Sequence, residues 1–137
     1  MLLTAVRSDF EWEKPGRQDG YLETENSVHR SAYGVVYTPL SVFNAGTGPT
    51  LLLMAGSHGD EYEGQLALSE LIRTIDIAKL RGRLIVMPTA NAPAAVAGNR
   101  LSPIDQGNLN RLFGQSITAG STAGMARFIK RWLLGIR

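Results

Sequence analysis

Two short unbroken apolar runs with an amphipathic segment between them form the clearest hydrophobic pattern in the chain. The runs cover residues 51–55, directly before Gly56, and residues 84–87, directly before Pro88. Unbroken runs of this length are typical of strands that a parallel sheet buries on both faces. Between them, apolar residues take the i, i+3, i+4 and i+7 positions of one helical face, at Leu68, Leu71, Ile72 and Ile75. The pattern predicts a strand, a helix and a second, parallel strand.

The residues before this unit divide into a polar stretch and two β-rich segments. Residues 1–27 are polar and mixed, with a turn signal at 14–16, and predict an N-terminal arm. Residues 28–36 and 40–43 are rich in β-branched and aromatic side chains, with Pro39 between them. We expect a strand in each segment, and the two could pair as a hairpin.

The residues after the unit predict a short helix, a loop and a longer amphipathic helix. Residues 90–97 are rich in alanine with Pro93 near the first turn, which suits a short helix, whereas residues 98–113 show no period. An apolar stripe at helical spacing follows, at Met125, Phe128, Ile129, Trp132 and Leu133. The fold class is therefore α/β. Because a strand normally follows such a helix in this class, we interpret the chain as truncated after it.

Composition narrows the class of protein and the kinds of site it can contain. A chain of 137 residues with 44% hydrophobic and 19% charged residues is typical of one globular domain. The formal net charge of +2 gives no support for a nucleic-acid partner, and no apolar run is long enough for a membrane span or a signal peptide. A cytoplasmic location is the default expectation. Because the chain has no cysteine, any metal must be bound by His, Asp or Glu.

The first candidate site lies where the first buried run ends and the helix begins. His58 and Glu61 are three residues apart there, a spacing that can bring an imidazole nitrogen and a carboxylate to one cation. Ligands of open α/β sheets bind beyond the carboxyl ends of the strands, which is where this segment lies. Alternatively, the acidic residues only complement the helix dipole. A nucleophilic Ser57 is a further reading, but the segment Gly-Ser-His-Gly lacks the G-x-S-x-G pattern.

The second candidate site is the loop after the second buried run. It carries Arg100 and Asp105, and it ends on the segment Asn108-Leu109-Asn110-Arg111. Guanidinium groups bind carboxylates through two parallel hydrogen bonds, and amides add directional donors, so the loop suits capture of a small acidic substrate. The alternative is a loop stabilised by Asx turns and surface ion pairs.

Together, the two motifs resemble the succinylglutamate desuccinylase/aspartoacylase family, whose members are related to the zinc carboxypeptidases. The resemblance rests on the order of residues 58–61, 91–93, Arg100 and 108–113, and it covers roughly residues 30–135. Residues 98–105 look most similar to the branch that includes the N-acetyl-diaminobutyrate deacetylases. The resemblance implies a mixed, mostly parallel sheet flanked by helices, with residues 28–137 as the N-terminal part of a catalytic domain.

The resemblance also implies a site and a reaction. His58 and Glu61 would bind Zn²⁺, and Arg100, Asn110 and Arg111 would bind the substrate, a small N-acyl amino acid whose amide bond is hydrolysed. The third zinc ligand and the general base of the family are expected beyond residue 137, so the chain alone is expected to be inactive. Two alternatives stay open, hydrolysis of an ester and an inactive module that binds a carboxylate. An exposed Trp132 face would favour homo-oligomerisation.

Overall fold

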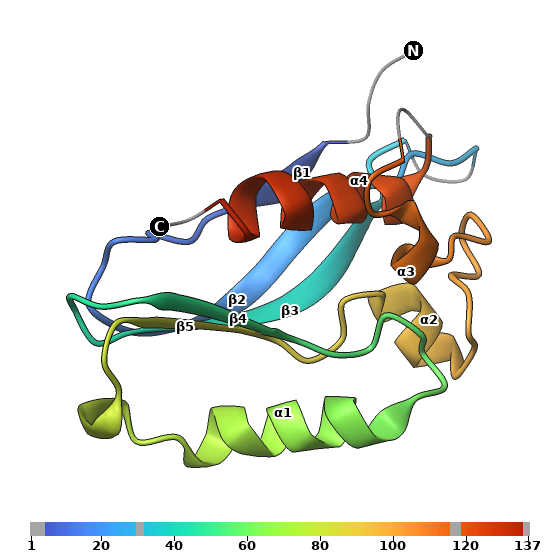
Figure 1. Ribbon diagram of the computed structural model, residues 1–137. Coiled ribbons are helices and arrows are strands. Elements are labelled where there is room, and N and C mark those ends of the chain that lie inside the picture. The colour runs from blue at the N-terminus through green and yellow to red at the C-terminus, as the bar shows by residue number, and fades with distance from the viewer. Residues whose placement is uncertain (1–4, 30–31, 116–118, 136–137) are drawn as a thin grey trace.

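The computed structural model describes residues 5–29, 32–115 and 119–135, which form one five-stranded sheet with helices on both faces (Figure 1). The strand order is β1-β2-β3-β5-β4. The strands are β1 (Val6–Ser8), β2 (Gly16–Glu25), β3 (Val35–Asn44), β4 (Thr50–Met54) and β5 (Arg83–Met87). The helices are α1 (Tyr62–Thr74), α2 (Ala92–Ala97), α3 (Leu109–Leu112) and α4 (Ser121–Phe128), with a 3₁₀ turn at Ile77–Lys79 and a π-helical turn at Ile129–Leu133.

The predicted strand–helix–strand unit is confirmed. β4 and β5 pair in parallel from Thr50–Arg83 to Met54–Met87, and α1 connects them across one face of the sheet. The predicted apolar stripe of α1 packs against a small buried cluster of the sheet, formed by Phe43, Leu84 and Val86. The unit therefore directs the carboxyl ends of both parallel strands toward the loops that carry the candidate site residues.

Of the described residues in the segment 28–36, only 35 and 36 belong to a strand, so the predicted hairpin with 40–43 is wrong; residues 30–31 of that segment lie outside the described residues. One continuous strand, β3, includes Pro39, and its partner is β2, which lies within the residues predicted to form an arm. Pro39 is tolerated because β5 pairs with β3 only from Ser41 to Asn44, which leaves that side of β3 without a partner strand at Pro39.

The sheet is mixed, as expected, but the parallel pairs are not in the majority among the described residues. Three of the four pairs are antiparallel and only β4–β5 is parallel. Two of the antiparallel pairs, β1–β2 and β2–β3, join consecutive strands, and such direct connections favour antiparallel neighbours. The two apolar runs also differ in burial. All of β5 is buried, whereas β4 is an edge strand here and its Leu51 is 55% exposed, so the expected burial of β4 on both faces is wrong in this part of the fold.

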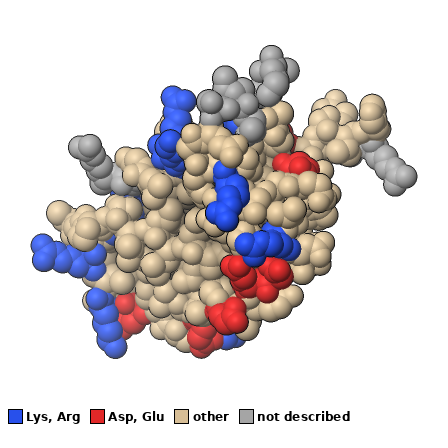
Figure 2. Space-filling model, turned by 45° about the vertical axis from the view of Figure 1, so that its right-hand side comes forward, with Lys and Arg blue, Asp and Glu red and all other residues tan. Residues whose placement is uncertain are grey.

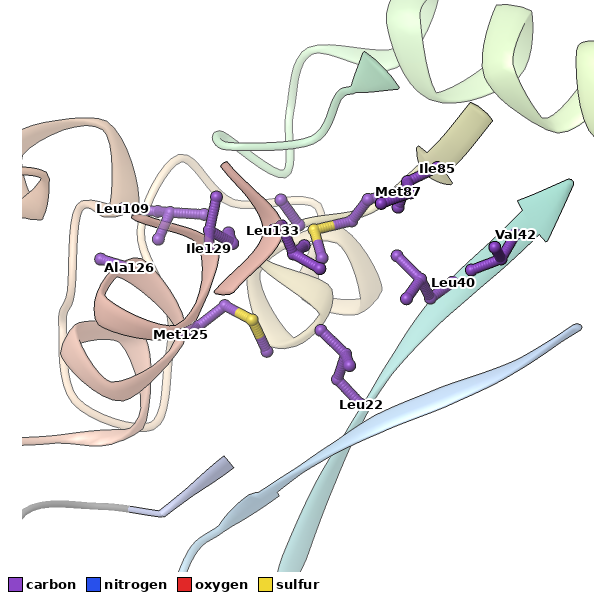
Figure 3. Packing of buried hydrophobic residues seen from close by; sticks show 11 residues of the cluster. Leu22, Leu40, Val42, Ile85, Met87, Leu109, Met125, Ala126, Ile129 and Leu133 are labelled. Atoms are coloured by element: carbon purple, nitrogen blue, oxygen red, sulfur yellow. The ribbon is translucent and has the colours of Figure 1, made fainter. Parts of the chain in front are cut away.

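The main core lies between the sheet and α4, on the face opposite α1 (Figures 1 and 3). It joins Leu22 and Leu40 of the sheet to Met125, Ile129 and Leu133. These last three residues are four apart, in keeping with the wider π-helical turn that ends the helix. The expected stripe is therefore only partly correct: its Phe128 packs at the margin of the core, and its Trp132 is 58% exposed.

Candidate active site

The first site segment is a tight loop between β4 and α1 that packs against α2. Gly56 adopts a left-handed conformation with φ of 67°, which favours glycine. Gly59 is required for space, because a Cβ atom there would lie 2.0 Å from the carbonyl oxygen of Ala94. Its amide donates to the carbonyl oxygen of Asn99 at 2.9 Å. These contacts hold the backbone on both sides of His58.

His58 is buried, with 5% of its surface exposed, and both of its ring nitrogens have a partner. The Nδ1 atom lies 2.9 Å from Oε1 of Glu61, and the Nε2 atom lies 3.1 Å from Oδ1 of Asn108. The sequence spacing predicted the proximity of His58 and Glu61. It did not predict the contact with Asn108, which lies fifty residues further along the chain.

Glu61 is the N-cap residue of α1, but its side chain makes no capping bond to the helix. The carboxylate instead faces His58, and Arg100 Nη1 lies 3.3 Å from the same Oε1 atom. The hydrogen bond with His58 lowers the pKa of Glu61 below its usual value, and the positive charge of Arg100 acts in the same direction. The carboxylate is therefore kept ionised, the form that a cation would bind.

The second site segment is an ordered loop whose central residue is Asp105. Its carboxylate accepts hydrogen bonds from the backbone amides of Gly107 at 3.0 Å and Thr122 at 2.9 Å, and from the Thr122 hydroxyl at 2.7 Å. Partial burial raises the pKa of Asp105, but hydrogen bonds, chiefly those from Thr122, hold that pKa below its usual value. Asp105 thereby ties the loop to the first turn of α4.

The predicted substrate residues lie around this loop. Arg100 is exposed and contacts Glu61, so it reaches the first site segment directly. Asn110 and Arg111 are exposed on α3, directly after Asn108, which contacts His58. Figure 2 turns this side of the molecule toward the viewer and shows acidic and basic side chains interspersed on it. The two sequence motifs thus lie at one edge of the sheet.

The donor atoms of His58 and Glu61 match part of what a zinc site needs. Within the described residues no group of three or more His, Cys, Asp or Glu side chains converges, but the Nδ1 atom and carboxylate at His58 and Glu61 do converge. Imidazole and carboxylate are ligand types that zinc accepts, and catalytic zinc sites usually have three protein ligands. The two residues therefore fit part of such a site.

Comparison with known proteins identifies the family. Residues 47–130 match the model described as the succinylglutamate desuccinylase/aspartoacylase catalytic domain. The chain belongs to this family. It is 40% identical over 129 residues to the N-alpha-acetyl-L-2,4-diaminobutyric acid deacetylase of Halomonas elongata. The matched region covers 94% of this chain and 38% of that protein. The expected family membership and branch are confirmed.

Solved structures of the family support the fold. A succinylglutamate desuccinylase/aspartoacylase from Rhodobacter sphaeroides matches with a TM-score of 0.88 and 38% identity, over 94% of this chain and 39% of that one. A product-bound ectoine utilization protein EutE (DoeB) from Ruegeria pomeroyi also gives a TM-score of 0.88, with 43% identity over 94% and 40% of the two chains. The present chain thus spans about two fifths of the length of these relatives. None of its described helices is long and apolar enough to cross a membrane.

Proposed function

We propose that the whole protein is a zinc-dependent hydrolase that cleaves the amide bond of a small N-acyl amino acid. The observation that carries the proposal is the convergence of His58 Nδ1 and Glu61 Oε1, 2.9 Å apart, at the carboxyl end of β4. The deacetylase and desuccinylase names of the relatives support the reaction class. A cytoplasmic location stays a prediction.

His58 and Glu61 would supply two of the zinc ligands. A zinc ion held there would act as a Lewis acid toward water and toward the scissile carbonyl. The part of this chain is to place the Glu61 carboxylate beside the guanidinium group of Arg100 and to hold the imidazole of His58 in a buried position. The third ligand and the general base stay predictions for residues beyond 137.

Arg100, Asn110 and Arg111 would bind the substrate. Arg100 lies within 3.3 Å of a proposed metal ligand, which places a guanidinium group beside the reacting centre. The exposed Arg111 would pair with a substrate carboxylate through two hydrogen bonds, which suits an amino acid. By analogy with the relative from Halomonas elongata, N-acetyl-2,4-diaminobutyrate is the first substrate to test.

The experiment is a steady-state assay of the whole protein with N-acetyl-2,4-diaminobutyrate, other N-acyl amino acids and the matching esters. We expect amide hydrolysis that a chelator abolishes and zinc restores. Arg111→Lys should raise KM roughly 10- to 100-fold and leave bound zinc unchanged, because lysine retains the charge without the planar fork, a loss on the order of 1.5–3 kcal/mol. Hydrolysis of esters only would support the alternative reaction.

The 137-residue chain by itself should bind zinc weakly and catalyse no turnover. Among the described residues two proposed ligands converge where three are usual, and the general base stays a prediction for residues beyond 137. Assay of the purified chain with added zinc tests this expectation. Zinc-dependent turnover that Glu61→Ala removes would refute it, and carboxylate binding without turnover in the whole protein would favour the binding-module alternative.

A further inference from the structure

A small cavity separates β2 and β3 from the starts of α2 and α4. Its polar lining consists of Thr24 of β2, Thr38 of β3, Asn91 at the start of α2, and Ser121 and Thr122 at the start of α4. All five residues are buried, and none of them carries a charge. Neutral hydroxyl and amide groups from three parts of the chain therefore surround one small space.

The hydroxyl group of Thr24 lacks a hydrogen-bond partner. Only 1% of this residue is exposed, yet its Oγ1 atom forms no hydrogen bond within the part of the chain that the structure describes. Val36, which is opposite Thr24 in the β2–β3 register, also lines the cavity, and its side chain offers no hydrogen bond. A buried polar group without a partner is costly, so nearly all such groups bond to protein or to ordered water. The hydroxyl of Thr24 therefore calls for a partner from the cavity.

The cavity has the size and the chemistry for one water molecule. Its volume is about 10 Å³, on the order of the smallest space that holds a water. A buried water typically makes about three hydrogen bonds, and the hydroxyl groups of Thr24 and Thr38 and the side chain of Asn91 can supply them. An ion fits poorly, because no charged side chain lines the cavity to compensate it.

We propose that this cavity binds one structural water, which bonds to Thr24 and bridges the sheet to Asn91. The bridge supports the second site segment, because Asn91 Nδ2 lies 3.5 Å from the carbonyl oxygen of Gly107, at the long limit of a hydrogen bond. On the opposite wall of the cavity, the hydroxyl of Thr122 donates to Asp105 of the same segment at 2.7 Å. The water belongs to the fold and is independent of the metal and of the reaction.

The stability of Thr24→Val tests the proposal by its sign. Valine has nearly the shape of threonine but no hydroxyl group. If a water bonds to Thr24, the variant loses that bond, and the thermal midpoint of the chain should fall by roughly 2–6 °C. Without the water, the variant removes a buried hydroxyl that has no partner, so the midpoint should stay the same or rise, and either result would overturn the proposal.

Thr50→Val is the matched control for this exchange in a strand. Thr50 begins β4 and is only partly buried, so its substitution reports the preference of a strand for valine without the cavity. We expect its midpoint to equal that of wild type within about 2 °C. The fall in Thr24→Val should exceed this difference.

Crystallography at high resolution tests the water directly and does not require the variant to fold. In the wild-type chain we expect one ordered water within hydrogen-bond distance of Thr24 Oγ1 and of the Asn91 side chain. In crystals of Thr24→Val its occupancy should be lower. A wild-type cavity without electron density, or one that holds a cation, would overturn the proposal.

Discussion

The two loops that meet at His58 are held in place by different means. The loop before α1 is fixed by close backbone contacts, in which Gly59 lies against the carbonyl group of Ala94 without room for a side chain. The loop before α3 is fixed mainly by one side chain, Asp105, which gathers hydrogen bonds from Gly107 and Thr122. Steric contact is hard to relax, whereas hydrogen bonds can be weakened by degrees. We therefore expect substitutions in the first loop to have the larger effects.

Gly59→Ala should produce the largest effect. The new methyl group would lie 2.0 Å from backbone atoms of Ala94, so the loop or α2 must move. We expect a loss of about 3 kcal/mol in the free energy of unfolding, together with loss of zinc binding. Chemical denaturation measures the first and chelator competition the second.

Gly46→Ala is the matched control for Gly59→Ala. Gly46 has a φ of 95° and nothing within 4 Å of its would-be Cβ atom, so only backbone strain of about 1–2 kcal/mol is expected. Equal losses in the two variants would show that the contact with α2 does not hold the first loop.

Asp105→Ala should produce the next largest effect. The carboxylate accepts from the backbone amide of Thr122 in the first turn of α4, whose own N-cap residue, Gly120, has no side chain. Loss of this cap and of the bond to Gly107 should cost about 2 kcal/mol of folding free energy. Thermal and denaturant unfolding measure it, and a variant as stable as wild type would refute the anchoring role.

A Cβ atom on Gly120 would lie 2.6 Å from the same carboxylate, so Gly120→Ala should lose part of the same stability, and the two losses should not add.

The pH dependence of stability should test the contribution of Asp105 to the second loop. The pKa of Asp105 is lower in the folded state, so its contribution is complete above the unfolded value of about 3.9 and is lost as pH falls through the folded value. The stability difference between wild type and Asp105→Asn should therefore be constant from pH 7 to about 5 and shrink at lower pH. Denaturant unfolding across this range measures it, and a difference that grows toward acid would contradict the assignment.

Arg100→Gln should have the smallest effect on folding. The ion pair with Glu61 is exposed, and such pairs contribute little to stability. We expect an unfolding midpoint equal to that of wild type within error, with a rise in KM for the N-acyl amino acid in the whole protein. A clear loss of stability would mean that Arg100 holds the second loop in place.

The parts of the fold that the sequence predicted are those with a strong local pattern. The unbroken apolar runs at β4 and β5 and the helical stripe of α1 are strong local signals, and the structure confirms these three elements, although β4 is not buried on both faces. β2 was missed because its residues are mostly polar and half exposed, with only Leu22 and Thr24 buried, so alternation of apolar and polar residues is weak. The π-helical turn after α4 was missed because the sequence pattern was matched to the 3.6-residue period of an α-helix. A π-helical turn is wider, so the later positions of the stripe shift around the helix and Trp132 is exposed.

The same distinction holds for the candidate site. The proximity of His58 and Glu61 follows from local spacing, so the sequence was sufficient to predict it. The contact between His58 and Asn108, and the hydrogen bonds that Asp105 accepts from α4, depend on how distant segments pack, which no local sequence pattern reports. Asn108 and Asp105 did stand out as polar residues of one loop. Their individual partners required the tertiary structure.

Zinc affinity of histidine variants tests the central claim, that His58 and Glu61 begin a metal site, most directly. The chain contains one other histidine, His29, which provides a matched control. In a chelator competition titration of the wild-type chain and its variants, His58→Ala and Glu61→Ala should each bind zinc at least about tenfold more weakly than wild type, because each removes one of two proposed ligands. His29→Ala should bind like wild type. Equal affinity of wild type and His58→Ala, or a loss confined to His29→Ala, would contradict the account.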